Sequence, residues 1–482
     1  MVDLRPVLYT LGSLIALLAV GMSLPTLADF VVDNPDWQTF AIALCLTAMI
    51  GGMLMLSTRG SGENLNLKQA FLLTTSAWAV LPAFAALPLA FSELDLSYTD
   101  AYFEAMSGLT TTGSTVITGL DTAPPGILLW RGLLQWFGGI GIVVMAVAVL
   151  PMLQVGGMQV FRVESFETAE KILPRAAQIS GLISGAYVAF TSLCMIAYML
   201  SGMSAFDALV HAMTTISTGG FSNSDSSFGK FDSLSTDTIC LIFMILGSMP
   251  FILFLQVIRG RPLALWRDEQ TRGFLLLVAF LCVGVTIWLM VFKNFTLEEA
   301  FRYGSFNIIS VLTGTGFASA DYSQWGAFSA SLFFVVMFIG GCAGSTSCGM
   351  KIFRFQVLLK SMRSWIEHTL QPNGVFIARY NGRPIPDDVR ASVMSFMTLF
   401  LGIFLILSFG IAATGEDWIT SLSSAGTAVA NVGPGLGDKV GPAGNFSGLT
   451  DAAKWMLSFG MLIGRLELFS VLVLFSPSFW RV

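Results

Sequence analysis

Four segments of this chain combine glycine with threonine or similar small residues at matching positions. Aligned on one glycine, the positions are Gly113, Gly220, Gly316 and Gly433. Glycine adopts backbone conformations that are closed to most other residues, so a glycine-rich loop can turn its carbonyl oxygens in one direction. A ring of such oxygens can replace the hydration shell of a cation. The spacing therefore predicts a cation site built mainly from backbone atoms.

The match between the four segments extends to their flanking residues. Each glycine is preceded by a polar residue nine positions before it, a hydroxyl six before it and a branched apolar residue four before it. In chain order these are Glu104, Ser107 and Leu109, then His211, Thr214 and Ile216, then Asn307, Ser310 and Leu312, and finally Ser424, Thr427 and Val429. Four unrelated surface loops would not share residue classes at so many positions. The predicted cation ligands are Thr111, Thr112, Gly113, Thr218, Gly219, Gly220, Gly314, Thr315, Gly316, Asn431, Val432 and Gly433.

Acidic residues follow the aligned glycines. Asp225, Asp321 and Asp438 stand five positions after three of them, and Asp121 stands eight positions after the first. Carboxylates around the outer mouth of a pore would raise the local concentration of cations. Aspartate is common in exposed loops, so the shared offset supports this prediction more than any single residue does.

The composition predicts that these loops belong to an all-α integral membrane protein. The 482 residues are 54% hydrophobic and 11% charged, whereas a soluble domain carries about 25% charged residues. A membrane-spanning helix needs ~20 apolar residues, and ten segments satisfy this. They lie near 7–28, 37–57, 69–92, 125–153, 179–202, 236–258, 273–292, 327–350, 391–413 and 452–475. The first is too long for the apolar region of a signal peptide, so we expect it to be retained.

The basic residues predict the orientation. With both termini in the cytoplasm, most of the 25 lysines and arginines fall on the cytoplasmic side, as membrane proteins prefer. The loops at 155–178, 259–272 and 351–390 are especially basic. The opposite orientation would invert this bias.

The glycine-rich segments follow predicted spans three, five, seven and nine. Before each segment a short, partly apolar helix is expected, and it begins at acids that suit the positive end of the helix dipole. Asp100 and Asp207 mark two of these beginnings, with Thr99 and Ser204 as candidate N-caps. Non-helical backbone cannot face lipid, so the four loops must gather inside the protein.

This pattern predicts four pseudo-symmetric repeats around one pore, each made of a helix, a pore helix, a filter loop and a second helix. Residues 1–62 would form an N-terminal pair of helices. The repeats would occupy 63–165, 166–262, 263–365 and 366–482.

A separate run of small residues interrupts the predicted span at 327–350. Gly340, Gly341, Gly344 and Gly349 flank hydroxyl residues, and such a run breaks a helix. Its depth places it just below the filter. Arg465 lies mid-span, where an arginine costs ~2.5–3.5 kcal/mol, so it needs acceptors from this loop or, alternatively, from Glu467. The predicted gate consists of Gly344, Ser345, Thr346, Ser347 and Arg465.

The same motifs carry a family resemblance. TTTGS at 110–114, STGGF at 217–221, TGTGF at 313–317 and ANVGP at 430–434 resemble the four filters of the Trk/Ktr/HKT potassium transporters. GGCAGSTSCGMK at 340–351 and GRLELFSVLVLFSP at 464–477 resemble the bacterial TrkH/TrkG branch. In that superfamily a serine at the first filter position accompanies Na⁺ permeation, whereas all four segments here keep glycine.

The resemblance implies K⁺ as the transported ion, with uptake across the bacterial inner membrane by a multi-pass homodimer. It also implies a cytosolic nucleotide-binding regulatory ring of the TrkA type, which the basic cluster of Arg354, Lys360 and Arg363 could bind. The positive-inside bias explains these charges equally well.

Other function classes find little support. Motifs of metalloproteases, serine hydrolases and nucleotide hydrolases are absent, and the six cysteines show no metal-binding spacing, so we expect no enzyme, no organic cofactor and no nucleic-acid partner. The open alternatives lie within transport. They are permeation by Na⁺, and coupling of uptake to H⁺ or Na⁺.

Overall fold

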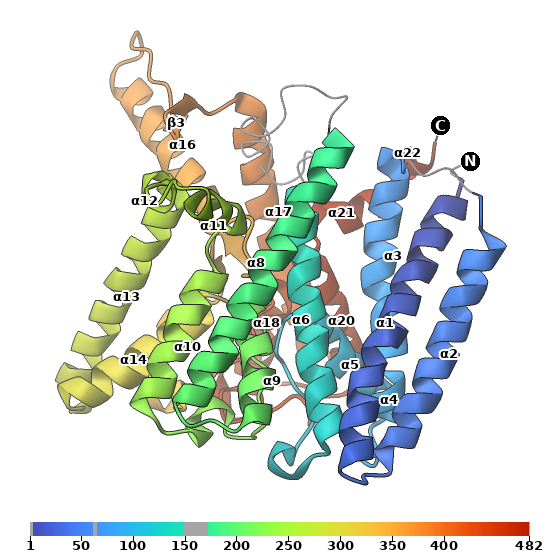
Figure 1. Ribbon diagram of the computed structural model, residues 1–482. Helices are drawn as coiled ribbons and strands as arrows, with labels where there is room; N and C mark the ends of the chain where they lie inside the picture. Colours follow the sequence, from blue (N-terminus) through green and yellow to red (C-terminus); the bar gives the residue numbers. More distant parts are fainter. Residues whose placement is uncertain (1–2, 61–64, 149–171, 482) are drawn as a thin grey trace.

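The computed structural model describes residues 3–60, 65–148 and 172–481, and these are mostly helical (Figure 1). The long helices are α1 (Arg5–Val31), α2 (Asp36–Ser57), α3 (Leu67–Ala85), α6 (Pro125–Ala148), α8 (Ile172–Leu200), α10 (Leu234–Gly247), α13 (Glu269–Lys293), α16 (Ile352–Leu370), α17 (Asp387–Ala412) and α20 (Asp451–Arg465). The end of the predicted span at 125–153, most of the basic loop 155–178 and two repeat boundaries, at 62/63 and 165/166, lie outside the described residues. Both termini lie at the same end of the molecule (Figure 1).

Four shorter helices lie between the long ones in the sequence. They are α5 (Tyr98–Leu109), α9 (Ala205–Ile216), α14 (Leu297–Leu312) and α18 (Trp418–Ala430). Their last turns lie in the protein interior, because the apolar residue four positions before each aligned glycine is buried: Leu109, Ile216, Leu312 and Val429. The short helices predicted before the glycine-rich segments are therefore present, and each ends where such a segment begins; we call them the pore helices.

The remaining elements are short. They are α4 (Leu87–Ala90), α11 (Phe251–Ile258), α12 (Ala264–Arg267), α15 (Ala327–Val336), α19 (Gly437–Val440), α21 (Phe469–Leu472), α22 (Pro477–Trp480), the 3₁₀ turns η1 (Leu120–Thr122), η4 (Ser227–Lys230), η5 (Tyr322–Trp325) and η6 (Val473–Phe475), and four two-residue strands. Strand β1 (Ile339–Gly340) pairs in parallel with β2 (Met350–Lys351), and β3 (Arg379–Tyr380) pairs antiparallel with β4 (Arg383–Pro384).

The helices support a multi-pass membrane protein. Within the described residues, seven helices are long and apolar enough to cross a bilayer, or up to nine if each of two bent pairs is one span. The predicted span at 327–350 is a ten-residue helix, α15, followed by non-helical chain. The ten spans predicted from the sequence thus stay a prediction, of which seven to nine are supported within the part of the chain that the structure describes.

Two predicted spans are bent sharply. The helices α10 and α11 meet at 95° across Ser248–Pro250, and α20 and the segment Phe469–Phe475 meet at 107°. Proline lacks the amide that would continue the first helix. In the second bend, Glu467 and Leu468 adopt positive φ angles of 58° and 52°, a conformation that costs ~1–3 kcal/mol for each such residue.

Two N-caps of the pore helices were predicted from the sequence, and the structure confirms one of them. Ser204 accepts a hydrogen bond from the Asp207 amide at 3.0 Å, as predicted. The first pore helix is capped by Ser97, which accepts from the Asp100 amide at 3.1 Å, and not by Thr99. Because α5 begins at Tyr98, Thr99 already lies inside the helix.

Candidate functional site

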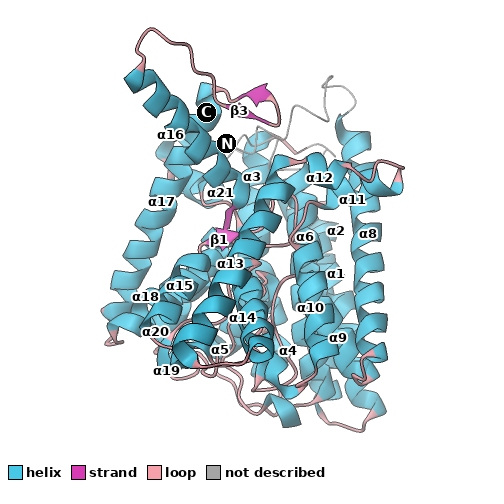
Figure 2. Cartoon of the chain, turned by 90° about the vertical axis from the view of Figure 1, so that its left-hand side faces the viewer, coloured by secondary structure: helices cyan, strands magenta, loops and turns pink. Residues whose placement is uncertain are grey.

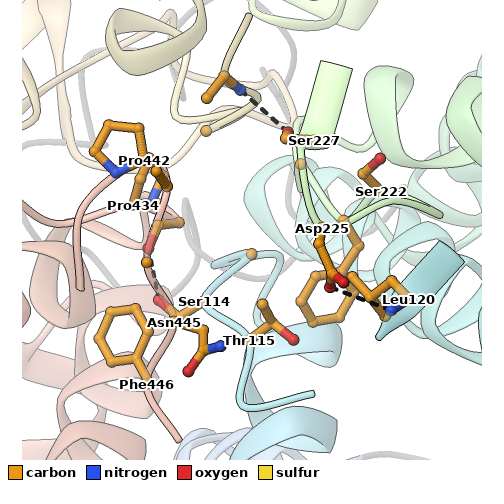
Figure 3. A pocket seen from close by; sticks show the side chains of 18 of the residues that line it. Ser114, Thr115, Leu120, Ser222, Asp225, Ser227, Pro434, Pro442, Asn445 and Phe446 are labelled. Carbon is orange, nitrogen blue, oxygen red and sulfur yellow. Dashed lines mark hydrogen bonds between the residues drawn. The ribbon is translucent and has the colours of Figure 1, made fainter. Parts of the chain in front are cut away.

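The four aligned glycines, far apart in sequence, line one cavity of about 280 Å³. Figure 3 labels residues from three parts of the chain around this space, among them Ser114, Asp225 and Pro434, and Gly316 and Ala318 line it from a fourth. The cavity lies near the ends of the buried pore helices, so the four loops gather in the interior. We call this space the vestibule.

The loops close into a ring in chain order. A Cβ atom added to Gly113 would collide with the carbonyl oxygen of Gly219, and one added to Gly220 would collide with that of Thr315. A Cβ on Gly316 would lie 2.8 Å from the amide nitrogen of Gly433, and one on Gly433 would lie 3.0 Å from the carbonyl of Gly113. Each glycine thus faces the backbone of the next loop, and the fourth faces the first.

The loop backbones share an unusual conformation. The residue two positions before each aligned glycine has positive φ: Thr111 at 53°, Thr218 at 50°, Gly314 at 77° and Asn431 at 51°. Three of the aligned glycines also have positive φ. Non-glycine residues rarely adopt this region, and they keep it only where surrounding contacts enforce it. The repetition of this geometry in four loops indicates a shared structural requirement.

Side chains both within and outside the predicted ligand set hold the loops together. Asn431 donates from Nδ2 to Thr112 Oγ1 at 3.0 Å, and Ser114 donates to the carbonyl of Gly433 at 2.8 Å, so the first and fourth loops are joined twice. Gln135 in α6 donates to the Gly219 carbonyl at 2.6 Å and accepts from the Phe221 amide at 3.0 Å. Ser114 and Gln135 were not among the ligands predicted from the sequence. An amide in an otherwise apolar span was the available signal for Gln135.

The polar position nine residues before each glycine braces the loop in three of the four units. Glu104 accepts from the Val116 amide at 2.9 Å, His211 Nε2 lies 3.0 Å from Ser222 Oγ, and Asn307 donates to Ser319 Oγ at 3.0 Å. In the fourth unit, Ser424 instead bonds to its own helix at Thr420. The aligned column therefore has a structural role that its residue types alone do not reveal.

Glu104 also forms a buried ion pair with Arg131 of α6, with Oε1 2.8 Å from Nε. The same guanidinium donates to the carbonyl of Ser222 at 2.8 Å and to Thr115 Oγ1 at 3.2 Å. It therefore links the first loop to the second. Arg131 also lines the vestibule, where its charge is balanced by Glu104.

The four predicted outer-mouth acids are not equivalent. Asp225 lines the vestibule and accepts hydrogen bonds from the amides of Gly119 and Leu120 at 3.0 and 3.1 Å. Asp121 pairs with Lys230 at 3.3 Å, and Asp321 caps η5. Asp438 is exposed in α19. Of these four acids, Asp225 is the one in the lining of the vestibule. A ring of four carboxylates around this cavity therefore stays a prediction.

The interrupted segment between β1 and β2 lies directly against the filter loops. Thr346 Oγ1 lies 2.9 Å from the carbonyl oxygens of both Ile216 and Gly247. Ser347 donates to the carbonyl of Thr313 at 2.6 Å. The two short strands hold the ends of this segment together, so residues 341–349 form one loop that packs against the glycine-rich loops; we call it the intramembrane loop.

Arg465 contacts this loop, as the sequence predicts. Its Nη1 atom lies 2.6 Å from Cys348 Sγ, and Nη2 donates to the carbonyl of Gly138 at 3.1 Å. The alternative acceptor, Glu467, pairs instead with Arg354. A small cavity of about 20 Å³ lies between the loop, Asn431 and Arg465, and this space holds about one water molecule.

With this geometry established, comparison with known proteins is informative. The family model described as TrkH, cation transport protein, matches residues 36–482. This chain belongs to the TrkH family. The description of that family names cation transport proteins.

Several TrkH-family relatives match over nearly the whole chain. The Trk system potassium uptake protein TrkI of Halomonas elongata is 44% identical over 99% of this chain and 97% of its own length. TrkH of Escherichia coli is 37% identical, with 99% of both proteins covered. The crystal structure of the potassium transporter TrkH from Vibrio parahaemolyticus matches with a TM-score of 0.92 at 33% identity, covering 100% of both chains. The resemblance noted in the sequence is thus confirmed.

Proposed function

We propose that this TrkH-family chain takes up K⁺ across a membrane through the ring of four glycine-rich loops. The observation that carries the proposal is the closed contact between successive loops, which gathers four equivalent backbones around one axis. The relatives named as potassium uptake proteins support the choice of ion. K⁺ is the transported substrate, and the proposal needs no organic cofactor.

In this proposal the filter consists of the three residues that end at each aligned glycine. In the first three stretches the backbone alternates between left-handed and ordinary conformations, whereas in the fourth only Asn431 is left-handed. Such alternation lets successive carbonyl groups point to the same side, where they can replace water around a dehydrated ion. The vestibule supplies the ion from outside, and Asp225 on its wall attracts cations.

The intramembrane loop and Arg465 would act as the gate. The loop fills the space beneath the filter, and the guanidinium adds a positive charge on the route of a cation. Conduction then requires the loop to leave its contacts with Ile216, Gly247 and Thr313. The structure corresponds to the closed state in this scheme.

The architecture we propose is four repeats at 63–165, 166–262, 263–365 and 366–482, preceded by a helix pair at 1–62. Counting the bent and interrupted segments as spans gives ten crossings, which agrees with two termini at the same end (Figure 2). We place that end on the cytoplasmic side of a bacterial inner membrane, because it carries the basic loops. A homodimer and a TrkA-type regulatory ring remain part of the proposal.

The test is cation flux into proteoliposomes that contain the purified chain. We expect ⁸⁶Rb⁺ and K⁺ to enter much faster than Na⁺ and Li⁺. Imposed H⁺ and Na⁺ gradients then separate passive from coupled uptake, since only a coupled transporter accumulates K⁺ against the electrochemical gradient of K⁺. Equal rates for Na⁺ and K⁺ would contradict the proposed selectivity.

A further inference from the structure

A second cavity lies toward the end of the molecule that carries both termini. Its volume is about 760 Å³, and its walls come from α11, α12, the first residues of α13 and the β3–β4 hairpin (Figure 1). Three arginines line it: Arg261, Arg267 and Arg272. All three are exposed. We call this region the arginine elbow, because it follows the 95° bend between α10 and α11.

The charges of the elbow are not balanced within the described chain. Of its two carboxylates, Glu269 pairs with Lys360. Asp268 accepts hydrogen bonds from the uncharged amide and hydroxyl of Thr271 at 2.8 and 3.0 Å and keeps its negative charge. Across residues 3–60, 65–148 and 172–481, no ion pair joins Arg261, Arg267 or Arg272 to an acid. Three guanidinium groups thus outweigh the single charge of Asp268, and the cavity keeps a net positive charge.

Apolar side chains surround these charges on the outside. Ile258, Leu263 and Trp266 are 76%, 59% and 61% exposed, although each belongs to the same turn of chain as an arginine. The helix α13 starts here and is apolar enough to span a bilayer. Exposed tryptophan beside arginine at the end of a spanning helix is typical of the boundary between water and lipid.

We propose that the arginine elbow binds the phosphate headgroup of an anionic phospholipid in the adjacent leaflet. Guanidinium groups donate in pairs to phosphate oxygens, and three of them around one cavity complement the negative charge of the headgroup. Basic pockets between spanning helices bind such lipids in other membrane proteins. Trp266 and Leu263 contact the glycerol and the upper acyl chains, which a soluble protein partner does not offer.

The elbow also contacts the intramembrane loop. The amide of Phe251, the first residue of α11, donates to the carbonyl of Gly344 at 3.0 Å. Gln270, in the first turn of α13, accepts from the amide of Ala343 at 2.6 Å. A lipid that holds α11 against α13 therefore also steadies the loop. This consequence for transport rests on the proposed gate, whereas lipid binding itself does not.

The test is lipid retention measured by native mass spectrometry. Wild-type protein is equilibrated with equal amounts of phosphatidylglycerol and phosphatidylcholine that have the same acyl chains. We expect preferential retention of phosphatidylglycerol and its loss in the triple variant Arg261→Gln/Arg267→Gln/Arg272→Gln. Each arginine should contribute roughly fivefold in affinity, as for basic residues near a charged membrane surface. Inorganic phosphate at millimolar concentration should not compete, since it lacks the acyl chains.

The matched control is Arg5→Gln/Arg59→Gln/Arg481→Gln, which removes the same charge from exposed residues outside the cavity. It should retain phosphatidylglycerol as the wild type does. Equal retention in both triple variants overturns the proposal, as does efficient competition by free phosphate. If the elbow variant loses a soluble regulatory partner while its lipid retention is unchanged, the elbow is a protein-docking face and the lipid proposal is wrong. None of these outcomes depends on which cation is transported.

Discussion

The hydroxyl oxygen of Thr218 lies 3.3 Å from that of Thr346, so the second filter loop and the intramembrane loop are in direct contact. Two further contacts join the same loop to other filter segments. Cys348 Sγ lies 3.4 Å from Thr111 Oγ1, and Ser347 donates to the carbonyl of Thr313. The intramembrane loop therefore touches three of the four filter loops from one side.

These contacts predict the effect of removing the loop or its arginine. Deleting residues 344–349, or replacing Arg465 by alanine, should raise the K⁺ flux because the path below the filter is widened or loses its positive charge. The preference for K⁺ over Na⁺ should persist, since the filter residues are unchanged. ⁸⁶Rb⁺ uptake with Na⁺ as competitor measures both quantities.

Arg363→Ala is the control for the loss of an arginine, because its side chain is 82% exposed and distant from the loop. It should leave the flux unchanged. If the deletion and Arg465→Ala both fold normally and conduct as the wild type does, the segment is not the gate. Misfolding of Arg465→Ala alone would indicate a purely structural role for this residue. The flux through the loop-deletion variant then decides whether the loop is the gate.

The ring of glycines predicts the effect of Gly113→Ser. Its Cβ atom would collide with the carbonyl of Gly219, and its φ of 87° is unfavourable for serine. The neighbouring loop must shift, so we expect the K⁺ over Na⁺ preference to fall about tenfold or more, as ~1–3 kcal/mol of backbone strain allows. Relative Rb⁺ and Na⁺ fluxes report the change.

Gly119→Ser is a matched control, because Gly119 has a similar φ of 75° but lies six residues further on, and the nearest atom to an added Cβ is Thr122 Oγ1 at 3.9 Å. It should cost similar strain without altering selectivity. Equal loss of selectivity in both variants would falsify the special role of the ring.

The buried pair of Arg131 and Glu104 predicts opposite effects of two neutral substitutions. Arg131→Gln leaves a carboxylate beside the vestibule, which should attract cations and favour the smaller Na⁺. Glu104→Gln leaves a guanidinium there, which should raise the half-saturating K⁺ concentration. Both should lower the melting temperature, because breaking a buried pair costs ~3–5 kcal/mol.

The double variant Glu104→Gln/Arg131→Gln removes both charges and should recover part of the K⁺ affinity. A pair that only stabilises the fold would move flux in the same direction in both single variants. That result would argue against an electrostatic effect on the vestibule.

The docking hypothesis for a soluble regulator needs one revision. Arg354 is fully buried and pairs with Glu467, so it cannot meet a partner in solution. Lys360 and Arg363 are 35% and 82% exposed at their side chains, and they remain candidates. Lys360→Glu/Arg363→Glu should release a co-purifying regulatory ring without affecting membrane insertion, which pull-down and size-exclusion chromatography measure. Undiminished co-purification contradicts docking at these residues.

The pH dependence of the outer loops follows from Asp121. Desolvation raises its pKa, but hydrogen bonds from Ser224 and the Asp225 amide, together with Lys230, lower the pKa below the ordinary 3.8. The folded state thus favours the carboxylate, and its stabilising contribution is complete above 3.8 and is lost as the pH falls through the lower folded pKa. The melting-temperature difference between wild type and Asp121→Asn should persist from neutral pH down to this range. Its disappearance near pH 6 would exclude this mechanism.

Local sequence patterns predicted the elements of the site well. The aligned glycines, the pore helices before them and the contact of Arg465 with the loop all follow from rules on backbone freedom, helix ends and buried charge. These rules concern neighbours in the sequence or the membrane environment. They therefore work before the tertiary structure is known.

Contacts between distant segments were not predictable in the same way. The pairing of Arg354 with Glu467 joins residues 113 positions apart, and no local pattern connects them. The bend after α10 depends on Pro250 together with Gly344, whose carbonyl oxygen accepts a hydrogen bond from the Phe251 amide. The cap at Ser97 differs from the prediction by two residues, an ordinary uncertainty in helix ends.

The closed ring of loops has a consequence for how this pore can change over time. Because each aligned glycine packs against the backbone of the next loop, the conformation of every loop is constrained by its neighbours. A bulkier residue in one loop collides first with the adjacent loop. The backbone of that adjacent loop must move before the substituted loop fits. New ion preferences would therefore arise through paired changes in adjacent loops, and single replacements would more often abolish transport than redirect it.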